Sequence, residues 1–317
     1  AAGRVQVVDL ALAAELAAQG RAPTATRLED LDVRRVWPVP DAPAHKYTRG
    51  VVGVVAGSVP YPGAAVLTVA GATATGCGMV RYVGPAHVRE QVVAAHPEVV
   101  AGGSTQVRVQ AWVVGPGVQD EDQSARVREV LQAAAAQDVP VVVDAGALDD
   151  VPDRVPATVV LTPHAGELAR FLSARGVPVE RSQVEAEPVR WAREAHVRSG
   201  ATVLLKGAVT LVVGAGDESC APVLAQGPAP AWLATAGAGD VLAGVLGALL
   251  AGVGARSDQP WSPGVIMRAV AAGVHVHGLA AAHANPGGPV TSPAVAHALP
   301  GVVARLLRPT GPRGRES

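Results

Sequence analysis

The strongest chemical signal in the sequence is a glycine-rich segment that leads into an acidic residue and an apolar run, Thr235-Ala236-Gly237-Ala238-Gly239-Asp240-Val241-Leu242-Ala243-Gly244. A glycine-rich turn that opens a helix presents backbone N–H groups and the positive end of the helix dipole, and both favour phosphate. A carboxylate at Asp240 could take a proton from a hydroxyl that attacks a phosphorus atom. Glycine and aspartate also make ordinary turns and N-caps, so the segment alone leaves both interpretations open.

Five further turns are polar or rich in glycine, and each follows a predicted strand. They are Gly57 to Ala64, Gly115-Pro116-Gly117, Asp144 to Leu148, Thr162 to Glu167, and Lys206-Gly207. Plain strand-to-helix loops use the same residue types. Ligands of parallel α/β sheets bind where the carboxyl ends of the strands meet, so we expect all five turns at one edge of a sheet, around a site.

The elements that must position these turns alternate along the chain. Nearly continuous apolar runs predict strands at 51–56, 79–83, 111–114, 139–144, 158–161, 202–205 and 210–213. Helical periodicity predicts helices at 63–76, 121–137, 165–175, 183–199, 239–252, 263–283 and 292–307. Strands that are apolar throughout are buried on both faces, so the pattern predicts an α/β fold with a mostly parallel sheet between helices.

Composition limits the classes of partner. The 317 residues are 49% hydrophobic and carry a net charge of −1, which indicates a globular chain without electrostatic capture of nucleic acid or anionic lipid. Cys77 and Cys220 have no CxxC or metal-ligand spacing, and they fit a reduced cytosol. The most apolar window, 233–253, contains Asp240 and several glycines, so we expect a buried helix there and no membrane span.

As an ordered set, these motifs resemble the ribokinase-like superfamily and, within it, the ADP-dependent NAD(P)H-hydrate dehydratases. The resemblance runs from about His45 to Leu307 and implies a three-layer α/β/α fold, a cytoplasmic location and a homotetramer. It rests on His45-Lys46, Ala56-Gly57-Ser58 with Tyr61-Pro62-Gly63-Ala64, Gly115-Pro116-Gly117, the Asp144 turn, Leu161 to Glu167, Leu205-Lys206-Gly207 with Thr210, and the Asp240 segment. It divides the chain into a remnant or linker at 1–44, a dehydratase domain at 45–310 and a disordered tail at 311–317.

The first of these parts resembles the end of the epimerase domain that is often fused ahead of such dehydratases. Val7-Val8-Asp9-Leu10 is similar to its last strand and Leu28 to Val33 to its connecting helix. The resemblance therefore implies an epimerase domain upstream in the full-length product.

The reaction that the resemblance implies is dehydration of the S-epimer of NADHX or NADPHX to NADH or NADPH. Hydrolysis of ADP to AMP and phosphate drives it, with Mg²⁺ present. Phosphorylation converts the C6 hydroxyl, a poor leaving group, into a good one. Asp240 would act as the base for that hydroxyl, and the N–H groups from Ala238 to Asp240 would hold the developing charge.

The resemblance also assigns binding roles. Ala64, Gly117, His164 and Asp240 match positions around the hydrated nicotinamide nucleotide. The predicted nucleotide contacts are Lys206, Gly207, Ala208, Val209, Thr210, Gly237, Ala238 and Gly239. Lys206 is one of only two lysines, and an ammonium can pair with a phosphate as a point charge. Glu167 either orders Mg²⁺ through water or is a first-turn glutamate stabilised by its helix dipole.

Some residues depart from the family pattern. Ala238 stands where the family commonly has threonine, and the alanine form is usual in related sugar kinases. His45-Lys46 is followed by Tyr47-Thr48-Arg49-Gly50 instead of the usual glycine-rich continuation. His275, His277 and His283 do not share one helix face, so we interpret them as packing or subunit-contact residues and not as zinc ligands.

Two other functions stay open from the sequence alone. The same base and anion-binding turn would serve a kinase of a small alcohol, such as a vitamin precursor or a sugar. A non-catalytic nucleotide-binding module is the third candidate, and the intact Asp240 and Lys206 count against it. The sequence does not distinguish ADP from ATP or NADHX from NADPHX.

Overall fold

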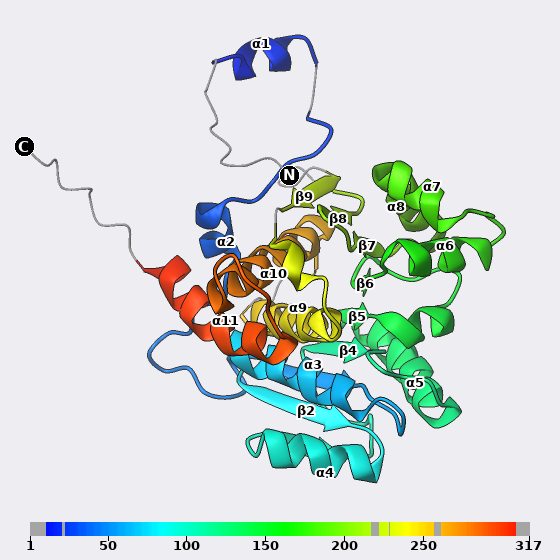
Figure 1. Cartoon of the computed structure of the whole chain (residues 1–317), viewed down its shortest axis with the longest axis vertical. Helices are drawn as coiled ribbons and strands as arrows, with labels where there is room; N and C mark the ends of the chain where they lie inside the picture. Colours follow the sequence, from blue (N-terminus) through cyan, green and yellow to red (C-terminus); the bar gives the residue numbers. More distant parts are fainter. Residues whose placement is uncertain (1–10, 21–22, 217–221, 228, 257–260, 309–317) are drawn as a thin grey trace, which may run out of the picture.

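The computed structural model describes residues 11–20, 23–216, 222–227, 229–256 and 261–308. Within them, one sheet of nine strands has the order β3-β2-β1-β4-β5-β6-β7-β8-β9 (Figure 1). The strands from β3 to β7 in this order run parallel, and β8 and β9 pair antiparallel at the end. Their bounds are β1 Val51–Val55, β2 Met79–Val83, β3 Val100–Gly102, β4 Ala111–Val114, β5 Val141–Val143, β6 Val159–Leu161, β7 Thr202–Leu205, β8 Thr210–Val213 and β9 Val223–Gln226.

Helices cover both faces of the sheet, which confirms the predicted three-layer α/β/α fold (Figure 1). Alternate side chains of a strand pack on opposite faces of the sheet. In β1, Val52 and Val54 belong to one apolar cluster, and Val51 and Val55 belong to the other. The first cluster includes residues of α2 (Asp30–Val36), α3 (Pro62–Thr75), α4 (Ala86–Ala95), α9 (Ala238–Gly254), α10 (Pro263–Ala284) and α11 (Ser292–Leu307). The second includes residues of α5 (Glu121–Gln137), the 3₁₀ turn η1 (Ala145–Asp150), α6 (Ala165–Ser173), α7 (Arg181–Ala186) and α8 (Pro188–Ser199).

Every strand and helix predicted between residues 51 and 307 is present, with ends shifted by a few residues. The predicted helix 183–199 is divided into α7 and α8 at Glu187, whose φ of −130° and ψ of 58° are not helical. Pro188 causes the break because it lacks an N–H and disfavours a helical residue before it. Strands β3 and β9 and helices α1 (Ala13–Ala18) and α4 were not predicted; β3 has only three residues at a half-exposed edge. Helix α2 overlaps the connecting helix that the resemblance implied at Leu28 to Val33.

Helix α9 is packed unusually closely on α3. A Cβ at Gly71 of α3 would lie 2.2 Å from the carbonyl oxygen of Val241, and one at Gly244 of α9 would lie 2.0 Å from that of Thr68. Neither position can hold a side chain without moving one backbone from the other. The apolar window at 233–253 thus forms mainly a buried helix, as predicted.

Helix α10 is the one helix in the described part of the chain that is long and apolar enough to cross a membrane. Two-thirds of its most apolar window (67%) is buried inside the fold, as in a core helix. Its apolar character is therefore explained by its place between α9 and α11 in the core.

The segment before β1 packs on the same core. Thr26 forms a parallel bridge with Leu224 of β9, and Leu28, Val33 and Trp37 are buried. Residues 26–37 therefore pack with the rest of the fold. That residues 1–44 derive from the end of an epimerase domain stays a prediction. The predicted strand 7–10 and tail 311–317 lie outside the described residues.

Candidate active site

The five predicted turns follow β1, β4, β5, β6 and β7, which are neighbouring parallel strands, so they share the carboxyl edge of the sheet as expected. Helix α9 begins at the same edge. Gly237 precedes it with a φ of +83°, a left-handed conformation that glycine adopts readily. A Cβ at Gly237 would also lie 2.4 Å from the side chain of Leu67, so glycine is required there on two grounds.

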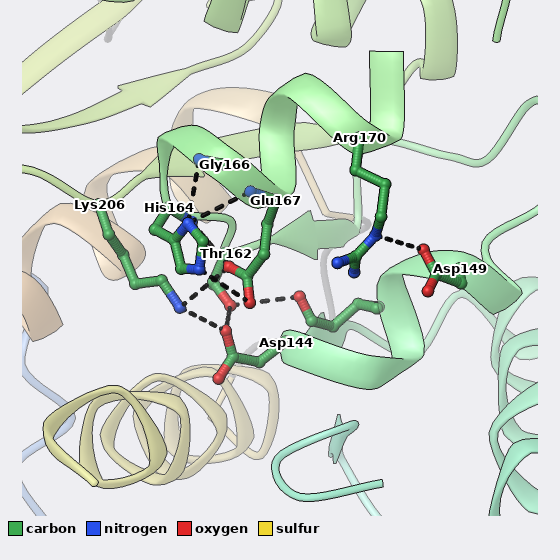
Figure 2. A network of polar contacts seen from close by, with 9 residues as sticks. Asp144, Asp149, Thr162, His164, Gly166, Glu167, Arg170 and Lys206 are labelled. Carbon is green, nitrogen blue, oxygen red and sulfur yellow. Dashed lines mark hydrogen bonds and ion pairs between the residues drawn. The ribbon is translucent and has the colours of Figure 1, made fainter. Parts of the chain in front are cut away.

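An ion pair between Lys206 and Asp144 is the centre of the polar network at this edge (Figure 2). The Lys206 Nζ atom lies 2.7 Å from Asp144 Oδ1, and the Thr162 hydroxyl donates to the same oxygen at 2.7 Å. The carboxylate side chain is 3% exposed and the lysine side chain 22%, so the pair is largely withdrawn from water. Burial makes this pairing obligatory, because either charge alone would be left unsolvated.

The beginning of α9 comes close to this pair. A Cβ at Gly239 would lie 3.6 Å from Lys206 Nζ and 3.9 Å from Asp144 Oδ2. The absence of a side chain at Gly239 therefore leaves space where the ammonium group meets the first turn of the helix. The first N–H groups of a helix have no partner within it, and here they face the same region as a lysine cation. The Ala238 N–H donates to the Thr235 carbonyl at 3.3 Å, and Gly239 and Asp240 follow it.

The electrostatics of the site depend on Asp240. Burial, with the negative charge of Asp144, raises the pKa of Asp240 from 3.8 to about 6 against the opposing effect of Lys206. Burial lowers the pKa of Lys206, but the charges of Asp144, Glu167 and Asp240 outweigh it, and the net shift is upward. At neutral pH the site thus combines a permanent cation with a carboxylate poised to accept a proton.

His164 is the N-cap of α6. Its Nδ1 atom accepts from the N–H groups of Gly166 (3.0 Å) and Glu167 (3.2 Å), so the neutral ring carries its proton on Nε2. The side chain is 56% exposed, which leaves that Nε2–H able to donate to a ligand. The capping interaction and a substrate contact are therefore compatible.

Glu167 completes this capping box. Its Oε2 atom accepts from the His164 N–H at 2.8 Å and lies 3.8 Å from Lys206 Nζ (Figure 2). The alternative of a first-turn glutamate is thus confirmed. Within the described residues, no three His, Cys, Asp or Glu side chains form a group that could hold a metal. The predicted water-mediated contact with Mg²⁺ stays a prediction.

Two of the predicted substrate positions are in direct contact. A Cβ at Gly117 would lie 2.6 Å from the Cβ of Ala64, so the turns after β1 and β4 touch there. The buried hydroxyl of Ser58 donates to the Gly117 carbonyl at 2.7 Å and fixes the approach. Small residues at both positions leave backbone, rather than side chain, at this surface.

The predicted nucleotide segment 206–210 connects β7 to β8. The Lys206 N–H donates to the Pro163 carbonyl at 2.9 Å, which ties this turn to the one that carries His164. Val209 is 54% exposed. The Ala208 carbonyl and Val209 lie beside Gly227, where a Cβ would meet the Ala208 oxygen at 3.3 Å.

Asp144 and Thr162 belong to the site, although their sequence context assigns them no chemical role. The available signal is that Asp144 and Lys206 both stand at the ends of predicted buried strands. A buried acid at that edge of the sheet requires a cation, and Lys206 is one at the same edge.

Comparison with known proteins agrees with this geometry. Residues 52–297 match the carbohydrate-kinase family model described as NAD(P)H-hydrate dehydratase. The chain is 45% identical over 257 residues to the bifunctional NAD(P)H-hydrate repair enzyme of Mycobacterium tuberculosis, covering 78% of this chain and 50% of that protein. It thus spans about half the length of the first curated relatives that it matches.

A shorter relative is matched along most of its length. The ADP-dependent (S)-NAD(P)H-hydrate dehydratase of Neisseria meningitidis is 35% identical over 252 residues, covering 75% of this chain and 78% of that protein. The crystal structure of the ADP/ATP-dependent NAD(P)H-hydrate dehydratase of Bacillus subtilis, co-crystallised with ATP and Mg²⁺, aligns with a TM-score of 0.74 and 28% identity, over 90% of this chain and 100% of that one. A hydroxyethylthiazole kinase of Pyrococcus horikoshii shares the fold alone, at 18% identity and a TM-score of 0.51.

The family match covers the turns that meet at the carboxyl edge of the sheet, the Lys206–Asp144 pair and the start of α9. The chain belongs to the NAD(P)H-hydrate dehydratase family.

Proposed function

We propose that this chain dehydrates the S-epimer of NADHX or NADPHX, with hydrolysis of ADP to AMP and phosphate. The observation that carries the proposal is the position of Asp240. It opens a buried helix beside a lysine cation and has a pKa raised to about 6, in a chain of the dehydratase family. A base near neutral pH and an anion-binding helix start are the two groups that phosphoryl transfer to a hydroxyl needs.

The proposed reaction balances in two steps. Asp240 accepts the proton of the C6 hydroxyl as its oxygen attacks the terminal phosphorus of ADP, and AMP departs with the electrons of the broken P–O bond. The phosphorylated C6 oxygen then leaves as phosphate while a proton is lost from C5, which restores the ring double bond. The products are NADH or NADPH, AMP and phosphate.

The other site residues would bind and orient. Lys206 would contact the phosphates as a point charge, with Asp144 and Thr162 holding it in place. The N–H groups at the start of α9 would stabilise the transferred phosphoryl group. Ala64, Gly117 and the Nε2–H of His164 would contact the hydrated nicotinamide nucleotide.

The carboxylates at the site fit a requirement for Mg²⁺. Asp144, Glu167 and Asp240 act on one lysine, so the region has more negative than positive charge before a diphosphate enters. A divalent cation bound mainly by phosphate oxygens and water would offset this excess, with Glu167 as an outer contact. When bound, the cation would neutralise charge on the transferred group.

The test is recovery of absorbance at 340 nm when purified protein, Mg²⁺ and ADP act on chemically hydrated NADH or NADPH. Parallel reactions use ATP, no nucleotide, and the variant Asp240→Asn. We expect nucleotide-dependent recovery that falls by about 10²-fold or more in Asp240→Asn. Folded protein that recovers no absorbance with either nucleotide would overturn the proposal, and phosphorylation of small alcohols would then favour the kinase.

The cellular setting is a further part of this proposal. We place the activity in the cytoplasm, in a homotetramer, with an epimerase domain upstream in the natural product. The match to half the length of bifunctional relatives supports the fusion. Size-exclusion chromatography with light scattering tests the tetramer.

A further inference from the structure

A second cavity lies at the opposite edge of the sheet from the candidate active site. Its volume is about 540 Å³, and its lining includes Val51, the first residue of β1, and Gly254, the last residue of α9. The active-site turns follow the other ends of the same strands. The two sites are therefore separated by the length of the sheet, and the loop between α2 and β1 runs past this second edge (Figure 1).

Two arginines line this cavity. Arg81 projects from the middle of β2, and its Nε atom is buried without a hydrogen-bond partner. Arg108 stands on the exposed segment before β4. Among the described residues, neither guanidinium forms an ion pair, so two permanent positive charges face one cavity uncompensated. The Arg81 Nε–H is thus a buried donor without a partner, which an anion in the cavity would satisfy.

In two more lining residues, Gln110 and His45, the acceptor atom is already used in a local hydrogen bond, so the group left for a ligand is an N–H donor. The Oε1 atom of Gln110 accepts from the Val51 N–H at 2.8 Å, which leaves its Nε2 amide as the free group. The Nδ1 atom of His45 accepts from the Tyr47 N–H at 3.3 Å, so the neutral ring has its proton on Nε2. The Thr48 hydroxyl holds this turn by bonding both the N–H and the carbonyl of His45, at 2.9 and 3.0 Å.

The remaining residues that line the cavity also favour an anion. No aspartate or glutamate of the described chain lines the cavity. The ring of Tyr47 is 54% exposed and offers a flat surface, and the Lys46 ammonium lies 5.3 Å from its centroid. The His45-Lys46 motif lies outside the candidate active site, and its histidine lines this cavity. Among the described residues, the lining thus combines cations, N–H donors and an aromatic face without an acidic group.

We propose that this cavity is a second binding site for a small phosphate-bearing anion, held by Arg81, Arg108, His45 and Gln110. Guanidinium groups and fixed N–H donors are the groups that recognise phosphate oxygens. The site is independent of the proposed dehydratase reaction, because it shares no residue with the turns at the carboxyl edge.

Inorganic pyrophosphate is the probe. Its binding is measured by isothermal titration calorimetry on the whole chain, with the nucleotide site saturated by a non-hydrolysable ADP analogue. We expect a saturable event that the double variant Arg81→Gln/Arg108→Gln weakens about tenfold or more, since hydrogen bonds to charged groups are the stronger ones. The matched control is Arg193→Gln, which removes an exposed arginine of α8 and should bind as the unaltered chain does.

Two further arms make the result decisive. AMP in place of pyrophosphate tests whether a base stacks on Tyr47: tighter binding that Tyr47→Ala abolishes identifies a nucleotide, and equal binding identifies phosphate alone. Crystals soaked in tungstate should show anomalous density between Arg81 and Arg108, a readout that does not depend on folding of a variant. Absence of pyrophosphate binding with the nucleotide site filled, or density only beside Lys206, would overturn the proposal.

Discussion

At the scale of single residues, the site is organised around charges that are largely withdrawn from water. Asp240 and Lys206 both have raised pKa values, although burial alone would push them in opposite directions. The carboxyl becomes harder to ionise because it is buried near another acid. The ammonium stays charged because three acids surround it. A base and a cation can therefore coexist at neutral pH within one small site.

The raised pKa of Asp240 predicts an acidic limb in the pH profile. A general base must be ionised, so kcat/KM should fall about tenfold for each pH unit below about 6 in the free enzyme. Initial rates between pH 5 and 8, with buffers of constant ionic strength, measure it. A flat profile down to pH 5 in protein shown to be folded would contradict the assignment of Asp240 as the base.

The same shift predicts that Asp240→Asn is more stable than the unaltered chain at pH 7.5. The folded state binds the Asp240 proton more tightly than the unfolded state does, so stability is lost as pH rises from about 4 to about 6. Above that window the ionised carboxyl destabilises the fold by about 3 kcal/mol, which the amide removes. Urea unfolding at pH 4 and 7.5 checks this, because the advantage of the variant should be confined to the higher pH.

Breaking the Lys206–Asp144 pair should lower the stability of the fold, whereas Asp240→Asn should raise it. Lys206→Met leaves a carboxylate that is 3% exposed without its cation, and we expect a loss of about 3 kcal/mol in the free energy of unfolding. Adding Asp144→Asn should restore part of that stability, because the stranded charge is then removed. A double-mutant cycle by urea unfolding measures the coupling. Additive losses would show that the two side chains do not interact.

At the scale of elements, most of the site could be predicted because its residues stand at strand ends. Strands buried on both faces are recognisable as apolar runs, and their parallel order brings their following turns together. The missed elements lacked that signal. Strand β3 is three residues long at an edge, and β9 contributes only Val223–Gln226. The Lys206–Asp144 contact was also missed, because which strands are neighbours cannot be read from periodicity.

The close packing of α3 on α9 predicts a defined effect of Gly71→Ala. The new Cβ would lie 2.2 Å from the Val241 carbonyl, next to Asp240, so α9 must move and the Asp240 carboxyl with it. We expect a loss of about 1–3 kcal/mol in stability, as for overpacked cores, with a reduced kcat. Thermal unfolding and steady-state kinetics measure the two effects.

Gly301→Ala is the matched control. Gly301 is also within a helix, α11, and a Cβ there meets nothing within 4 Å. Alanine at this position should stabilise the chain by up to about 1 kcal/mol with unchanged kcat. If both alanine variants behaved alike, the effect would belong to helix propensity and not to the α3–α9 contact.

At the scale of the whole molecule, the segment before β1 is part of the fold. Beyond the core contacts of Leu28, Val33 and Trp37, Arg34 donates to the carbonyls of Leu306 and Arg308 at the end of α11. His275 of α10 also lies 2.8 Å from Asp30. This segment therefore joins the beginning of the chain to its last two helices.

Truncation tests that role. A chain that begins at residue 38 loses three buried apolar side chains, and we expect it to be less stable by about 5 kcal/mol. A chain that begins at residue 23 keeps all three and should unfold like the full chain. Guanidinium unfolding of both truncated chains measures the difference. Equal stability of the two would show that residues 26–37 add nothing to the core.

The bridge between Thr26 and Leu224 has a consequence for synthesis on the ribosome. Thr26 is translated long before the strand that it pairs with, and Leu28, Val33 and Trp37 emerge with it. At about 5–20 residues per second, these apolar side chains wait on the order of ten to forty seconds for β9 to appear, and longer for α10 and α11. Residues 26–37 therefore expose apolar side chains throughout this interval, and slow codons between Thr26 and Leu224 would lengthen it.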